Sequence, residues 1–111
     1  MIEHCENGTG IEVKPLINLL QYQDSSIVSR VLLKNKGGTV TLFAFDVGEG
    51  LSEHTAPFDA LVVVTEGVAD IEIAGEGFKV RQGETLLLPA NRPHAVKAAT
   101  QFKMLLIMIR A

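Results

Sequence analysis

Short apolar segments separated by glycine or proline turns follow one another along most of this chain. The segments are rich in Val, Ile, Leu, Phe and Thr, and none continues long enough at a 3.6-residue period to indicate a helix. Strands bounded by frequent turns are typical of sandwiches and barrels. We therefore predict an all-β fold. The predicted strands are 26–34, 39–47, 61–65, 68–74, 78–80, 85–88, 94–97 and 102–109.

The first two predicted strands form the clearest hairpin, because residues 35–38 (NKGG) between them have the composition of a turn. Before this hairpin, Val13–Leu20 is apolar enough for a short strand or turn packed at one edge, and 21–25 has loop composition. We expect one domain over the whole chain, in which 1–25 form an arm and edge segment and 26–111 form the barrel.

Composition limits the class of protein. The chain has 111 residues with 47% hydrophobic and 21% charged residues, which indicates one globular domain. Cys5 is the only cysteine, so neither an internal disulfide nor a multi-cysteine zinc site can form. The start MIEHCENGTG does not resemble a signal peptide, and the aliphatic run 104–109 is too short to span a bilayer. We expect a cytoplasmic protein without a membrane partner.

The net charge of -3, with Lys and Arg scattered along the chain, argues against a nucleic-acid partner. Two segments, Ala60–Val64 and Met104–Ile109, are apolar at every position, whereas a strand with one wet face alternates. Their outer faces must therefore be covered. Either Val13–Leu20 covers them, or a second copy does so in a symmetric homodimer. We favour the homodimer, because one short segment cannot easily cover two strands.

Two spaced motifs give the chain a family likeness. Gly48 is followed after five residues by His54, and Gly67 follows that histidine after twelve more. Later, Gly83 is followed after five residues by Pro89, and His94 comes after four more. In this pattern the chain resembles a small single-domain cupin. The resemblance implies a jelly-roll barrel of two antiparallel sheets, also described as a double-stranded β-helix. It also implies three histidines and a glutamate that hold a divalent metal inside the barrel.

The chain departs from the cupin pattern at the metal-ligand positions. The second histidine of the family's His-x-His falls on Ala56, and the glutamate falls on Ala60. Of the family's four ligands, only His54 and His94 remain. Asp59 is next to the glutamate position, but a shift of one residue along a strand points a side chain to the opposite face. The motif is thus degenerate, and a divalent transition metal (Fe, Mn, Ni, Cu or Zn) could be held at most weakly.

With two ligands replaced by alanine, the resemblance implies a small apolar hollow that contains two imidazoles. The residues expected to line it are His54, His94, Ala56, Ala60, Val62, Val64, Met104 and Met108. The two methionines could equally be plain core. We interpret the chain as a cupin that binds a neutral or anionic small molecule near the two histidines.

Two alternatives to this interpretation remain open. The chain could be a metal-dependent oxygenase or isomerase with a reduced histidine set, or a structural dimer with a vestigial pocket. Whether it is an enzyme is therefore undecided, and no residue is assigned a catalytic role. His4 beside Cys5 is interpreted as part of the amino terminus rather than as a metal site. Glu66 and Glu84 are interpreted as solvated turn residues.

Overall fold

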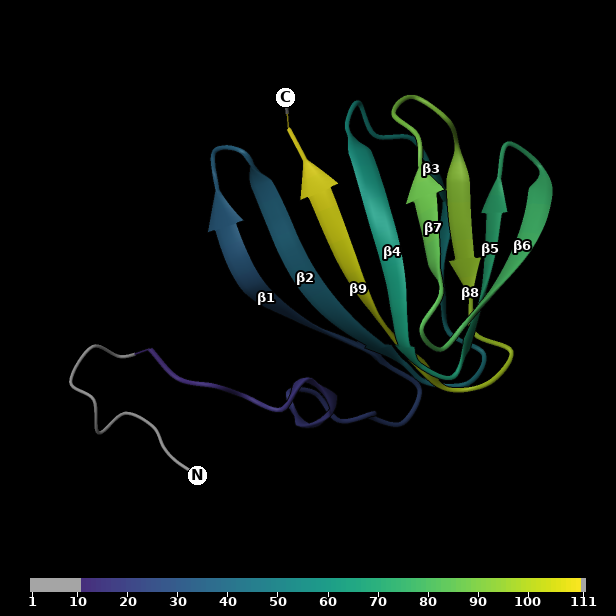
Figure 1. Ribbon diagram of the computed structural model, residues 1–111. Helices are drawn as coiled ribbons and strands as arrows, with labels where there is room; N and C mark the ends of the chain where they lie inside the picture. Colours follow the sequence, from purple (N-terminus) through teal and green to yellow (C-terminus); the bar gives the residue numbers. More distant parts are fainter. Residues whose placement is uncertain (1–10, 111) are drawn as a thin grey trace.

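The computed structural model describes residues 11–110, so His4 and Cys5 lie outside the described residues. Nine strands and one short 3-10 turn make up the regular structure of this part of the chain (Figure 1). They are η2 (Leu16–Asn18), β1 (Ile27–Asn35), β2 (Gly38–Phe45), β3 (Gly50–His54), β4 (Asp59–Glu66), β5 (Val68–Ile73), β6 (Glu76–Arg81), β7 (Thr85–Leu88), β8 (His94–Lys97) and β9 (Phe102–Ile109). Within residues 11–110, no helix is long and apolar enough to cross a membrane.

The strands form two sheets that face each other. The five-stranded sheet has the order β1-β2-β9-β4-β7, and the four-stranded sheet has the order β3-β8-β5-β6. Every pairing in both sheets is antiparallel. β9, last in sequence, lies between β2 and β4, which is how a jelly roll brings distant segments side by side. The prediction of an all-β jelly roll is confirmed.

The inner faces of the two sheets share one core. Phe45 of β2 and Phe102 of β9 stack at its centre, with ring centroids 4.5 Å apart, and both are fully buried. Val62 and Val64 from the five-stranded sheet and Ile71 from the four-stranded sheet belong to the same buried cluster. The strict alternation of buried residues along β4 and β5 is the expected pattern for strands with one face in a core.

One strand was missed. β3 was not predicted as a strand, because its sequence GLSEH has a glycine, polar residues and no apolar alternation. Of the two alternatives for Val13–Leu20, a short strand or a turn packed at one edge, the structure shows the turn: η2 occupies its middle and Leu20 is buried against the sheet, while Val13 is 99% exposed. The turn NKGG is confirmed, because Asn35 and Gly38 are paired at the end of the β1–β2 hairpin.

The outer face of the five-stranded sheet is covered at one end only. Leu20 packs there on Leu42 and Ala44, together with the partly buried Leu19 and Tyr22. Toward the other end, each strand contributes one aliphatic residue to a continuous line across the sheet. This aliphatic row, joined by the pairing register, is Leu33, Val40, Ile107, Leu61 and Leu87. The amino-terminal segment is therefore a cover, but it hides only part of the apolar face.

Candidate functional site

The turns of the barrel bring His54 and His94 together. His54 ends β3, His94 begins β8, and the two residues are direct partners in the sheet. Their ring centroids lie 4.3 Å apart, with the ring planes at 67°. His94 is 9% exposed, while His54 is exposed. The pair therefore reaches from the barrel interior to solvent.

A bulge in β3 makes this meeting possible. Leu51 pairs with Val96, but the next pair is His54 with His94, so three steps along β3 oppose two along β8. An extra residue in one strand shifts its side chains by one position relative to the partner. Leu51 and His54 consequently oppose residues of one face of β8, the face that holds the buried Val96 and His94. In a regular strand successive side chains alternate between the two faces, so without the bulge Leu51 and His54 would lie on opposite faces.

The loops beside the pair are tied to each other. The Asn91 N–H donates to the Ala56 carbonyl at 2.8 Å, and the Ala90 N–H donates to Oδ1 of Asp59, also at 2.8 Å. Asn91 occupies the second-motif position where cupins have glycine, and its φ of 64° lies in the left-handed region that Asn tolerates better than most residues. The glycine-to-asparagine departure is therefore compatible with the turn that positions His94.

The hydrogen bonds of the two imidazoles fix their tautomers. Nδ1 of His54 lies 3.0 Å from the Ser52 carbonyl oxygen, and Nδ1 of His94 lies 3.3 Å from that of Arg92. A carbonyl oxygen only accepts, so each Nδ1 carries the proton and each neutral ring keeps a bare Nε2. Among residues 11–110, no group donates to either Nε2. The pair thus offers two acceptor nitrogens.

Burial keeps His94 neutral. Desolvation lowers the pKa of His94 below its ordinary value of 6.5, and the nearby His54 lowers it further, against the raising effect of the hydrogen bond to Arg92. At neutral pH the His94 ring therefore accepts hydrogen bonds through Nε2 rather than acting as a cation. This protonation state suits a hydrogen-bond donor or a metal ion, and it disfavours a simple anion.

The remaining predicted lining residues lie at different depths. Ala60 begins the inner face of β4, opposite Met108 of β9, and Figure 1 shows these strand ends at the same end of the barrel as the start of β8. Val62 and Met104 are farther along the strands, 0% and 1% exposed, within the packed core. Ala60 and Met108 therefore lie at the barrel end of the imidazoles, whereas Val62 and Met104 serve as core.

The donor set does not fit a resident metal. Catalytic metal sites use at least three protein ligands in most cases. In the described part of the chain, no group of three His, Cys, Asp or Glu side chains could hold an ion. Asp59 cannot replace the missing glutamate, because it is exposed and its Oδ1 accepts the Ala90 N–H. Two imidazoles remain, which is a partial site.

A separate hollow of about 650 Å³ lies along the four-stranded sheet. Its lining includes Gly50, Asp70, Glu72 and Lys97, which alternate with buried residues and so belong to the outer face. Neither histidine lines it. The sheet carries both charge signs there, so the hollow shows no preference for one kind of ion, and it is not part of the candidate site.

Comparison with known proteins gives the family. The profile described as Cupin domain matches residues 41–110, well over half of the chain and including both histidines. The chain is a cupin. The cupin resemblance drawn from the two motifs is confirmed. No curated protein sequence matches the chain.

Solved structures agree with this assignment. A conserved protein of unknown function from Streptococcus pyogenes is 32% identical, with a TM-score of 0.85 over 90% of this chain and 88% of that one. A cupin 2 conserved barrel domain protein from Leptotrichia buccalis is 41% identical, with a TM-score of 0.82, over 85% of this chain but 46% of that one. Salicylate 1,2-dioxygenase from Pseudoaminobacter salicylatoxidans, at 16% identity and a TM-score of 0.70 over 75% of this chain and 26% of that one, shares the fold alone.

Sequence reasoning missed the groups that orient the imidazoles. These are the backbone carbonyls of Ser52 and Arg92, each two residues before the histidine that it orients. A backbone carbonyl has no signature in a sequence, because every residue has one. The repeated two-residue offset is visible only once the β3 bulge and the turn before β8 are known.

Proposed function

We propose that this cupin binds a small molecule at the barrel end where His54 and His94 meet. The observation that carries the proposal is the contact between two rings whose Nδ1 atoms are already satisfied by backbone carbonyls. His94 is buried, and a buried polar atom without a partner costs free energy, so a ligand that supplies a donor to its Nε2 gains at this position. The half-buried Ala56 and the buried Ala60 add little bulk near the pair.

The chemistry of the two rings narrows the ligand class. Two bare Nε2 atoms accept hydrogen bonds, so the ligand should present hydroxyl, amide or amine hydrogens. Apolar groups beside these donors would contact Met108 and Ala60, which lie on the inner face at the same end. A transition metal ion would use the same two lone pairs, and with two protein ligands its binding should be weak.

A second candidate function is a metal-dependent oxygenase or isomerase. The likeness to a dioxygenase supports it only at the level of the fold. Such an enzyme would need further metal ligands from the substrate, because only two imidazoles are available. A third candidate, a structural dimer with a vestigial pocket, would bind no ligand at the imidazoles.

We further propose that the protein is a homodimer. The aliphatic row of the five-stranded sheet leaves Leu33 and Leu87 58% and 54% exposed, and Ile109 beside it 58% exposed. Apolar side chains that line up across a whole sheet face are typical of an association surface. This property is compatible with any of the three functions.

A thermal-shift screen with a metabolite library tests the binding proposal. A true ligand at a hundredfold excess over its dissociation constant adds about 2.7 kcal/mol to the free energy of unfolding. The stabilisation should disappear in His54→Phe and His94→Phe, which keep a ring but remove both nitrogens. It should persist in the control Lys79→Ala, whose side chain lies on β6 at the other edge of the same sheet. Full stabilisation in both phenylalanine variants would place the ligand elsewhere.

Metal analysis separates the first two functions. Protein purified without chelator should contain far less than one equivalent of Fe, Mn, Ni, Cu or Zn per chain. One tightly held equivalent that is lost in His94→Phe would favour the metal enzyme instead.

A further inference from the structure

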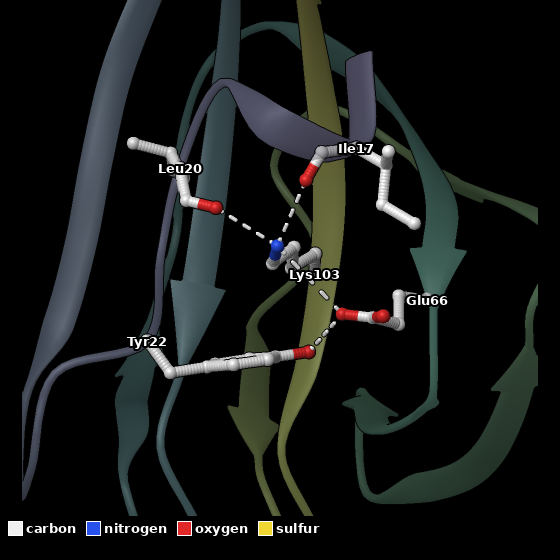
Figure 2. Close-up of polar contacts among 5 residues, drawn as sticks. All are labelled: Ile17, Leu20, Tyr22, Glu66 and Lys103. Carbon is white, nitrogen blue, oxygen red and sulfur yellow. Dashed lines mark hydrogen bonds and ion pairs between the residues drawn. The ribbon is translucent and has the colours of Figure 1, made fainter. Parts of the chain in front are cut away.

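Lys103 is a buried lysine on the outer face of the five-stranded sheet, only 5% exposed. Its Nζ donates to the Leu20 carbonyl at 2.8 Å and to the Ile17 carbonyl at 3.1 Å, and lies 3.7 Å from Oε1 of Glu66 (Figure 2). The ammonium group thus has two hydrogen-bond acceptors and one ion-pair partner. The lysine therefore fastens residues 17–20 to β9.

Tyr22 completes this attachment from the other side. Its ring lies 5.0 Å from Nζ of Lys103, and its hydroxyl donates to Oε1 of Glu66 at 2.6 Å (Figure 2). Burial, and then the hydrogen bond and charge of Glu66, raise the pKa of Tyr22, so the hydroxyl stays protonated and keeps donating. We call residues 16–22 the strap and the Lys103, Glu66 and Tyr22 contacts the latch.

The strap decides which part of the apolar sheet face is hidden. Beneath it, Ala44 and Leu42 are 0% and 1% exposed, and Leu105 packs against the same cluster. The register places Leu42 and Leu105 in the line next to Val40 and Ile107 of the aliphatic row. Without the strap, the exposed apolar face would therefore extend without a break from the aliphatic row to Leu42 and Leu105.

The chemistry of the uncovered face favours a second copy as its occupant. Strands about 4.8 Å apart make the aliphatic row about 20 Å wide. A stable interface buries about 800 Å² on each partner, so a second copy would also contact neighbours of the row such as Val63 and Ile109. The exposed Asp59 is paired with Ile109 at the rim of this face, but the row itself is aliphatic and is therefore complementary to the same row of a second copy. Two copies can thus pair by the same surface around a twofold axis.

We infer that the latched strap sets the border of the interface between two copies of this chain. The second copy docks on the aliphatic row, and the strap keeps Leu42, Ala44 and Leu105 out of that interface. This inference rests on the homodimer proposed above and adds to it a device that limits how far the interface extends. When the latch is broken, the whole face becomes available and association should proceed beyond the defined dimer.

Thiol labelling tests the border and the dimer separately. In a full-length Cys5→Ser background, Ala44→Cys places a thiol beneath the strap, and Leu87→Cys places one in the aliphatic row. We expect Leu87→Cys to react quickly in dilute protein and at least about tenfold more slowly at high concentration, as the second copy covers it. Ala44→Cys should react slowly at every concentration.

Lys103→Glu then breaks the latch, because it places a carboxylate beside Glu66 and two carbonyl oxygens. We expect labelling of Ala44→Cys to accelerate at least about tenfold, given the lost charged hydrogen bonds. Sedimentation should show species larger than a dimer. Lys103→Met is the second variant, should Lys103→Glu fail to fold, and Lys79→Glu is the surface control that should change neither rate.

The possible failures are distinct. If labelling of Leu87→Cys does not depend on concentration, the row binds no second copy and the homodimer is wrong. If Ala44→Cys stays protected in both Lys103 variants while Leu87→Cys behaves as expected, the dimer stands and the latch is wrong. If the strap is released but the assembly remains a dimer, the strap does not set the border.

Discussion

Two buried polar groups of this cupin differ in how far their hydrogen-bonding capacity is used. Lys103, 5% exposed, donates to two backbone carbonyls and forms an ion pair with Glu66, all supplied by the chain itself. His94, 9% exposed, uses Nδ1 on a backbone carbonyl and, within residues 11–110, keeps Nε2 without a donor. A group whose capacity is fully used stabilises the fold, whereas one with capacity left gains from a ligand. The latch is accordingly structural, and the imidazole pair is the candidate site.

The largest effect should come from removing the fully used group. Lys103→Ala removes the cation paired with Glu66 and the donor to two carbonyl oxygens. We therefore expect the free energy of unfolding to fall by about 3 kcal/mol, the low end for a broken buried ion pair because Glu66 is partly exposed. Urea denaturation measures it. Lys79→Ala, which breaks a surface pair with Asp70 at 2.7 Å, should cost less than about 1 kcal/mol. Equal losses of stability in the two variants would show that Lys103 contributes no more to the fold than a surface lysine.

The second prediction restores what the imidazole pair lacks. Ala56→His combined with Ala60→Glu should raise metal affinity by at least about a hundredfold, because an imidazole and a carboxylate that bind the metal directly are added to a partly formed site. Isothermal titration with Zn²⁺ or Ni²⁺ measures this gain. Ala56→His combined with Asp59→Glu is the matched control, since residue 59 is exposed and lies on the opposite face of β4. A similar gain in both variants would show that Ala60 does not face the pair.

A smaller effect is expected at the edge of the latch. Tyr22→Phe keeps the ring beside Lys103 and removes only the hydroxyl that donates to Glu66 at 2.6 Å. The loss should be about 1 kcal/mol, the usual net value of one hydrogen bond. Chemical denaturation at neutral pH measures it. If Tyr22→Phe lowers the free energy of unfolding as much as Lys103→Ala does, the tyrosine hydroxyl rather than the lysine ammonium contributes most to holding the strap on the sheet.

The smallest effect concerns the pH dependence of stability. The pKa of His94 is lowered in the folded state, so the unfolded chain binds a proton that the folded chain does not. Stability should be complete above about pH 6.5 and fall as the pH drops from there toward the folded-state pKa. His94→Phe should remove this part of the dependence. An unchanged slope between pH 7 and pH 5 would mean that His94 titrates normally.

The sequence was a good guide to the fold and a partial one to the site. The ranges 85–88, 94–97 and 102–109 match strands of the structure at both ends, because apolar runs between turns determine them directly. β3 was missed because its side chains are mostly exposed, and its bulge depends on the partner strand. The motif spacing identified the family and both histidines. It could not reveal the orienting carbonyls or the latch.

Lys103 shows why the contacts of the latch could not be predicted from the sequence. A lysine between Phe102 and Met104 in an apolar strand predicts nothing about its partners, and the two carbonyls that accept its hydrogen bonds lie more than 80 residues earlier, in the strap. Glu66 was interpreted as a solvated turn residue, yet it accepts from Tyr22 and pairs with Lys103. Such contacts depend on how the arm folds back on the sheet, and no short-range pattern encodes that.

The proposed binding site depends most on the bare Nε2 atoms of the two histidines. Nitrogen-15 NMR of the imidazole rings at pH 8 observes the protonation of each ring nitrogen directly. We expect both His54 and His94 to carry the proton on Nδ1, with Nε2 unprotonated. Protonated Nε2 atoms in the ligand-free protein would contradict the proposed site, because the pair would then have no acceptors to offer.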